Sequence, residues 1–192
     1  MNGEKVDRRI KYTKMLLKNS LIDLMREYPI SKISVKMLCE KADINRSTFY
    51  AHYSDQFELL KKLECEVISE FERQIESQCF EKHDKKSVNW LNEILMYVAE
   101  NAELCKVLLG DNGDPDFQRE IMRLAQQKTL TELRNYKNMD TRTSEYLQSF
   151  TVTGALNVVQ KWLQDGMIET TEQMAEFTSR LLYKGISEFH NQ

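Results

Sequence analysis

Apolar residues recur every three or four positions along this chain, and residues that break helices are rare. Its 192 residues include only two prolines and six glycines, whereas leucine, glutamate and lysine, which favour helices, are plentiful. An apolar spacing of three to four residues is typical of amphipathic helices that bury one face. We therefore expect an all-α protein of about nine helices.

The N-terminal region predicts a helix-turn-helix. A first helix spans residues 7–28, and Pro29 ends it because the residue before a proline is disfavoured in the helical conformation. Two short helices follow, at residues 35–42 and around residues 46–50, with a turn at residues 43–44 between them. Two short helices joined by a tight turn form a helix-turn-helix.

Three polar residues are placed to cap the N-termini of helices. Ser34, Asn45 and Ser54 stand directly before the second, third and fourth expected helices, where a side-chain oxygen accepts a backbone N–H. The fourth helix carries an apolar stripe from Phe57 to Ile75, and its 25 or so residues span roughly 38 Å. We expect residues 1–53 to form the helix-turn-helix domain and residues 54–192 a C-terminal regulatory and dimerisation domain.

The C-terminal part predicts five further helices. They begin near Ser87, Asn101, Asp116, Thr143 and at a capping box of Thr170 with Gln173. The acidic loop GDNGDPD precedes the third of them and places proline at the first helical position. Because the loop lacks the order of ligands of an EF-hand, we interpret it as a turn and cap, not as a calcium site.

The helix expected at residues 143–165 is apolar over most of its circumference. Its polar residues form one narrow stripe of Thr153, Asn157, Gln160 and Gln164. Such a helix needs cover on more than one side. We expect it and the last helix to pair with their copies in a second subunit, as a four-helix interface. The alternative is that both helices are buried within one subunit.

Charge is distributed unevenly along the chain. Residues 1–62 hold 13 Lys and Arg against 8 Asp and Glu, whereas residues 63–192 hold 14 against 22. A basic N-terminal part suits contact with phosphates, although ordinary solvated surfaces also differ in charge by such amounts.

Several classes of function have no support in the sequence. The four cysteines are far apart and form no metal or disulfide pattern, and no nucleophile with its base and no phosphate-binding loop is visible. No apolar run approaches the roughly 20 residues that cross a bilayer, and the N-terminus does not read as a signal peptide. We expect a cytoplasmic protein that is not an enzyme and has no cofactor, metal or membrane partner.

The segment ISKISVKMLCEKADINRSTFYAHYSDQFELLKKL resembles the DNA-binding domain of the TetR family, with the TFY signature at Thr48, Phe49 and Tyr50. The resemblance covers about residues 8–63. The rest is similar to the C-terminal region of one TetR-type subgroup through LLGDNGDPDF, Gly154 and KWLQDGM. The resemblance implies a homodimeric transcription regulator that binds a palindromic operator in double-stranded DNA, with repression as the family's usual mode.

Position in the helix-turn-helix then predicts the DNA-binding residues. Lys36, Arg46 and Ser47 are expected near base edges, where the fork of Arg46 suits the two acceptors of a guanine. Side chains expected at phosphates are Ser34, Thr48, Tyr50 and His52. For any one of these, an ordinary solvated or capping side chain is the alternative.

Two residues depart from the family's usual pattern. Asp43 stands where glycine is common in the turn, and Gln56 stands where a lysine usually meets a DNA phosphate. A lost phosphate contact predicts a weaker and less salt-sensitive complex. Gln56 also supports the alternative function, an interaction protein or co-activator of the same fold that acts through a partner regulator.

A small-molecule effector is expected to bind among the fourth to eighth helices and to exclude DNA by shifting the fourth helix. The candidate pocket residues are Met96, Tyr97, Leu104, Phe117, Phe150 and Trp162. Residues of this kind are more often part of the plain core, and they do not identify a ligand.

Overall fold

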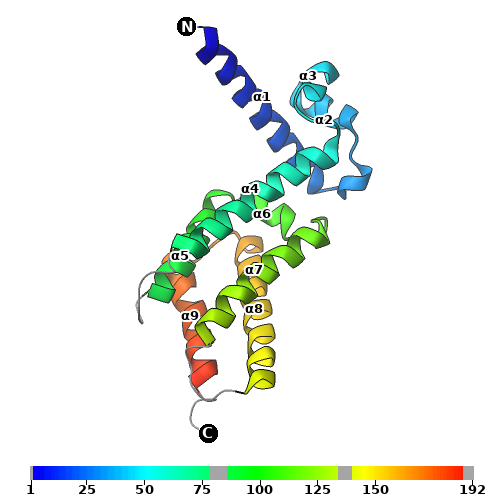
Figure 1. Cartoon of the computed structure of the whole chain (residues 1–192). Coiled ribbons are helices and arrows are strands. Elements are labelled where there is room, and N and C mark those ends of the chain that lie inside the picture. The colour runs from blue at the N-terminus through cyan, green and yellow to red at the C-terminus, as the bar shows by residue number, and fades with distance from the viewer. Residues whose placement is uncertain (1, 78–85, 134–139, 188–192) are drawn as a thin grey trace. The chain divides into compact units, whose positions relative to one another are not determined.

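The computed structural model describes residues 2–77, 86–133 and 140–187, and all regular elements within these ranges are helices (Figure 1). The elements are α1 (Asn2–Met25), the 3-10 turn η1 (Ile30–Lys32), α2 (Val35–Ala42), α3 (Arg46–Tyr50), α4 (Gln56–Ser77), α5 (Lys86–Glu100), α6 (Ala102–Leu108), α7 (Pro115–Leu133), α8 (Thr141–Gln164) and α9 (Thr171–Ser187). The expected all-α fold is confirmed. Within the described ranges no helix has the length and apolar character that a membrane crossing requires.

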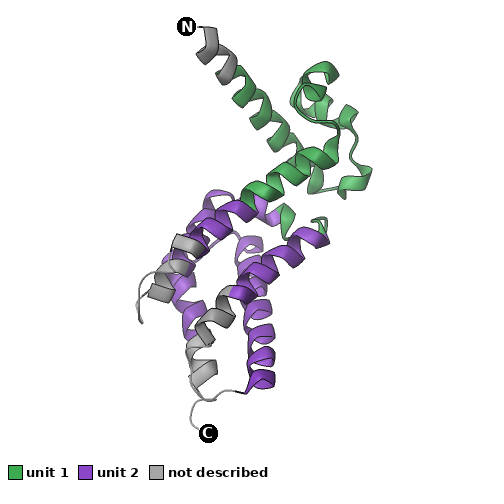
Figure 2. Cartoon of the chain, viewed as in Figure 1, with its two compact units in different colours: residues 1–67, 107–114 green, residues 68–106, 115–192 purple. Residues whose placement is uncertain are grey.

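The chain divides into two compact units (Figure 2). Unit 1 contains residues 1–67 and 107–114, and unit 2 contains residues 68–106 and 115–192. Helix α4 therefore contributes residues to both units. The expected boundary after residue 53, between a DNA-binding domain and a regulatory and dimerisation domain, stays a prediction.

Unit 1 has a core of apolar side chains from four helices. Helix α1 packs against α2. Buried apolar side chains include Leu17, Leu21, Ile33, Leu38, Phe49, Leu59 and Leu63. Phe57, expected on the inner stripe of α4, is instead exposed. Because Phe57 stands in the first turn of the helix, the buried face begins two residues later, at Leu59.

The segment 107–114 is held to unit 1 by a long-range hydrogen bond. Asn112 Nδ2 donates to the backbone carbonyl of Met25 at 3.0 Å. Met25 is the last residue of α1, three residues before the end expected from Pro29. The N–H groups of Arg26 and Tyr28 still bond to carbonyls of the last turn of α1, at 3.3 and 2.9 Å. Residues 26–28 therefore form a closing turn instead of a further helical turn.

The helix caps predicted around the helix-turn-helix are confirmed only in part. Ser34 Oγ accepts the N–H of Met37 at 3.2 Å, as expected, and Asp43 adopts the left-handed conformation with φ 52°. Asn45 stands before α3, but its side chain makes no capping hydrogen bond. The expected cap of α4 by Ser54 is wrong, since Asp55 Oδ1 accepts the N–H of Glu58 at 2.8 Å and the helix begins at residue 56.

Unit 2 is built from paired helices, with α5 against α9 and α7 against α8. Gly166, with φ 86°, follows the end of α8. The expected capping box of α9 is confirmed, because Thr170 N–H donates to Gln173 Oε1 at 2.9 Å and Gln173 N–H donates to Thr170 Oγ1 at 3.3 Å. Trp162 Nε1 donates to the carbonyl of Glu169 at 3.0 Å and so joins the end of α8 to the approach to α9.

Candidate nucleic-acid interface

Helix α3 has one packed face and one presented face. Phe49 is fully buried and lies against the rings of Tyr50 and Tyr53, with centroid distances of 5.6 and 5.8 Å. Arg46, Ser47 and Tyr50 are exposed, and 58% of Tyr50 is accessible to solvent. A helix of five residues cannot hold itself in water, so burial of Phe49 is what fixes the direction of its polar side chains.

All eight predicted DNA-binding residues lie in unit 1. Lys36, Arg46, Ser47 and Tyr50 are exposed, and so is Ser34, although its oxygen is engaged as the cap of α2. The side chains of Thr48, His52 and Gln56 are partly buried. The structure thus brings the eight residues to one unit, and their contact with DNA stays a prediction.

A groove of about 680 Å³ in unit 1 brings part of this set together with α1. It is lined by Arg9, Tyr12, Thr13 and Leu16 of α1, Lys36, Cys39 and Glu40 of α2, the turn residues Asp43, Ile44 and Asn45, and Arg46 and Thr48 of α3. Sequence reasoning missed Arg9 and Tyr12. Their spacing of three residues, which places them on one face of a helix, is the signal that marks them.

The groove is lined by three cations, Arg9, Lys36 and Arg46, and by two carboxylates, Glu40 and Asp43. Lys36 Nζ lies 3.6 Å from Glu40 Oε1, whereas Arg9 and Arg46 form no ion pair with any residue of the described ranges. Burial raises the pKa of the Cys39 thiol, and the positive charge of Arg46 partly opposes that rise. The groove therefore holds a neutral, buried thiol beside two guanidinium groups that have no ion-pair partner among the described residues.

The predicted effector-binding residues are not gathered in one place by the described cavities. Leu104, Phe117 and Trp162 are buried, Tyr97 is partly buried, and Met96 and Phe150 are exposed. Phe150 has 80% of its surface accessible. The effector site stays a prediction.

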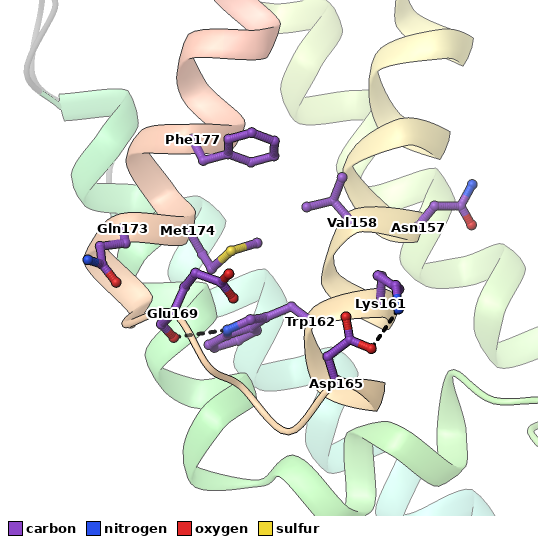
Figure 3. Close-up of a pocket in the computed structure, with 9 residues that line it drawn as sticks. All are labelled: Asn157, Val158, Lys161, Trp162, Asp165, Glu169, Gln173, Met174 and Phe177. Atoms are coloured by element: carbon purple, nitrogen blue, oxygen red, sulfur yellow. Dashed lines mark hydrogen bonds and ion pairs between the residues drawn. The ribbon is translucent and has the colours of Figure 1, made fainter.

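A pocket of about 450 Å³ lies in unit 2 between the last turns of α8 and the start of α9 (Figure 3). It is lined by Asn157, Val158, Lys161, Trp162, Asp165, Glu169, Gln173, Met174 and Phe177. Of the six predicted effector residues only Trp162 is among them. Figure 3 shows Val158 of α8 pointing toward Met174 and Phe177 of α9 across the pocket.

Comparison with known proteins identifies the family. The family model for a transcriptional regulator C-terminal region of the TetR type matches residues 85–184, slightly more than half of the chain. No curated protein sequence matches the chain significantly.

Solved structures share the fold across nearly the whole chain. A TetR transcriptional regulator from Streptococcus agalactiae 2603V is 24% identical with a TM-score of 0.64, and the match covers 94% of this chain and 98% of that one. SmeT, the repressor of the Stenotrophomonas maltophilia multidrug efflux pump SmeDEF, is 12% identical with a TM-score of 0.63, over 90% and 89% of the two chains. FadR from Bacillus subtilis in complex with stearoyl-CoA is 11% identical with a TM-score of 0.62, over 88% and 96%. With its all-helical fold and its matched C-terminal region, this chain belongs to the TetR family of transcriptional regulators.

Proposed function

We propose that this regulator binds a palindromic operator as a homodimer and acts as a ligand-responsive repressor. The observation that carries the proposal is the division of α3, in which a buried Phe49 supports exposed Arg46, Ser47 and Tyr50. Major-groove reading needs a short helix that presents polar or cationic side chains from a rigid base. Arg46 is assigned to a guanine, because its guanidinium fork matches the two acceptors of that base.

Phosphate contacts are assigned to the edges of the same surface. Of the side chains predicted at phosphates, Ser34 precedes α2, Thr48 and Tyr50 lie in α3, and His52 follows it. Arg9 adds a cation from α1. Arg9 and Arg46 have no ion-pair partner among the described residues, which favours an anion beside them, and the backbone of DNA carries one negative charge per phosphate. Arg9 thus offers a phosphate contact at a different point from the one that Gln56 lacks.

Dimerisation through α8 and α9 is supported by their exposed apolar side chains. Tyr146 and Phe150 on α8 and Phe177 and Leu181 on α9 are all more than half exposed. Large exposed apolar side chains in this number favour burial against a second copy. In such a dimer, two helix-turn-helix regions about 34 Å apart, one turn of DNA, bind two half-sites at once. The dimer therefore binds DNA more tightly than one subunit does.

The oligomer is tested by sedimentation of a double variant, Phe150→Glu with Leu181→Glu. We expect it to sediment as a monomer, because charge on the apolar face opposes its burial. Phe57→Glu is the matched control, since Phe57 is an exposed aromatic residue of unit 1. A double variant that sediments like the parent protein contradicts this interface.

The effector is assigned to unit 2, as a small molecule that binds among its helices. One neighbour of the same fold, FadR from Bacillus subtilis, was solved with stearoyl-CoA. Buried Leu104, Phe117 and Trp162 supply apolar surface that suits part of such a site. A ligand that favours a separation of the two helix-turn-helix regions unsuited to the operator lowers the affinity for DNA. By linkage, DNA lowers the affinity for the ligand by the same factor.

The function is tested by fluorescence anisotropy with DNA from the region upstream of the protein's own gene, across a salt series. Affinity well above that for random DNA, falling steeply with salt, is expected. Affinity no higher than for random DNA contradicts the proposal.

The second candidate is an interaction protein or co-activator that acts through a partner regulator. It is favoured by Gln56, the first residue of α4, because the resemblance to the TetR family leads one to expect a lysine at this position. Operator binding that appears only after a partner protein is added supports this candidate over the first.

A further inference from the structure

We infer that Lys62 is a positioning residue that clamps the turn after α3 onto α4, and so sets the direction in which α3 meets DNA. The inference rests on the proposed DNA binding for its functional consequence. The clamp itself is a property of unit 1 alone.

The ammonium of Lys62 meets three groups. Its Nζ lies 2.7 Å from Glu58 Oε1 and 3.4 Å from the carbonyl oxygen of His52. The same atom lies 4.9 Å from the centroid of the Tyr53 ring, within the range of a cation–π contact. One side chain of α4 thus contacts two consecutive residues of the turn.

Glu58 extends the clamp to the third residue of the turn. While Oε1 faces Lys62, Oε2 accepts the backbone N–H of Ser54 at 2.7 Å. The N–H of Glu58 donates in turn to Asp55 Oδ1 at 2.8 Å. The carboxylate therefore bridges the lysine and the turn, and its own backbone is fixed by the cap of α4.

The turn is joined just as directly to α3. The N–H groups of His52 and Tyr53 both donate to the carbonyl of Phe49, at 2.9 and 3.0 Å. Phe49 is the buried anchor of α3, and the Tyr53 ring lies against it. A continuous set of contacts therefore runs from Lys62 through the turn to the anchor of the presented helix.

The engagement of Lys62 argues against a direct contact with a phosphate. A lysine in a DNA-binding unit is usually assigned to the DNA backbone, where it contributes to the salt dependence of binding. Here the ammonium stays charged but is paired with the Glu58 carboxylate, whose hydrogen bond raises the pKa of Lys62. Loss of Lys62 should therefore weaken binding without changing how steeply binding depends on salt.

The experiment compares Lys62→Met and Lys62→Arg with the control Lys61→Met. Lys61 is the preceding residue and is similarly exposed, and it pairs with Glu64 of its own helix. Its loss bears on stability but leaves the contacts of the turn after α3 untouched. Affinity for the upstream DNA is measured by anisotropy across a salt series. We expect Lys62→Met to bind roughly fivefold more weakly with an unchanged salt slope, Lys62→Arg to recover most of the loss, and Lys61→Met to resemble the parent protein.

Hydrogen–deuterium exchange of the DNA-free variants provides a second readout. Amides of residues 52–54 should exchange several times faster in Lys62→Met, whereas amides of the α1 core keep their protection. Uniformly faster exchange throughout unit 1 would indicate a general loss of stability and overturn the assignment. Unchanged exchange at residues 52–54 in Lys62→Met would also overturn the assignment. The same holds if Lys62→Met binds DNA as tightly as the parent protein.

The two proposals fail in different ways. In Lys62→Met, a slope of log K against log salt that is shallower by about 0.9 would mean that Lys62 contacts a phosphate. That result would overturn the positioning role and would still support DNA binding. If the parent protein does not bind the DNA, the proposed function fails, and the exchange rates at residues 52–54 still decide whether the clamp exists.

Discussion

Phe49 and Tyr50 are adjacent in α3, and their rings meet edge to face with centroids 5.6 Å apart, yet Phe49 is fully buried and Tyr50 is exposed. The first ring anchors the helix, and the second stands at its solvent face. This relationship lets so short a helix serve as a rigid platform. Loss of the anchor and loss of the presented ring should therefore have different consequences.

Phe49→Ala should lower the free energy of unfolding of unit 1 by about 3–5 kcal/mol, since it removes a fully buried aromatic side chain. Tyr50→Ala should cost less than about 1 kcal/mol, because most of its surface already faces water. Chemical denaturation, followed by amide exchange in α2, measures both. Equal losses would contradict the division of α3 into two faces.

Gln56→Lys should strengthen DNA binding at low salt. The added cation stands where the resemblance places a phosphate contact, so the slope of log K against log salt should steepen by about 0.9. Gln56→Met is the control, because it keeps the length of the side chain without charge. An identical slope in both variants would remove this position from the interface.

The Glu58 carboxyl should titrate far below its ordinary range. Its hydrogen bonds to Lys62 and to Ser54 lower the pKa from 4.5 to about 2. Between pH 4.5 and about 2 the unfolded chain takes up a proton that the folded chain does not. The stabilising contribution of Glu58 is therefore complete above pH 4.5 and is lost as the pH falls toward 2.

Carbon-13 NMR of the glutamate carboxyls measures this pKa. In Lys62→Met the value should rise toward 4.5, and in Lys61→Met it should stay low. A Glu58 that titrates near 4.5 in the parent protein would exclude the clamp as described.

Glu64 is a buried carboxyl whose charged form is disfavoured by its surroundings. Its side chain is 1% exposed, its Oε1 has no hydrogen-bond partner among the described residues, and Lys61 lies 3.4 Å from Oε2. Burial raises the pKa of Glu64, and Asp114 raises it further. Because the folded chain holds this proton to higher pH than the unfolded chain, stability decreases as the pH rises above 4.5.

Glu64→Met should therefore raise the free energy of unfolding by about 1–2 kcal/mol at pH 7, and by less at pH 4. Denaturation at the two pH values tests this, with Glu66→Met, an exposed residue of the same helix, as the control. A destabilised Glu64→Met at pH 7 would mean that the carboxylate has a partner that stabilises it.

Local chemistry made most of the fold predictable. The cap at Ser34, the left-handed Asp43 and the capping box at Thr170 each depend on residues within three or four positions, and all three are confirmed. One error arose where two neighbouring residues both suit the same cap. Ser54 and Asp55 both suit a cap, and only the path of the chain decides that Asp55 serves.

Features that depend on distant segments were not predictable. The hydrogen bond from Asn112 to Met25 joins residues far apart in the chain. The groove lined by both Arg9 and Arg46 depends on how α1 packs against α2. Phe150 illustrates another limit. The spacing of apolar residues in the sequence does not distinguish a core residue from one that is exposed, as Phe150 is on α8.

The most direct test of the account is operator binding by a double variant, Arg46→Ala with Tyr50→Ala, measured by anisotropy on the upstream DNA. Both side chains are exposed, so the variant should keep its fold, as helical content and sedimentation would verify. We predict that affinity falls to the level of random DNA. A folded double variant that binds the operator as tightly as the parent protein would contradict the proposal that α3 reads DNA.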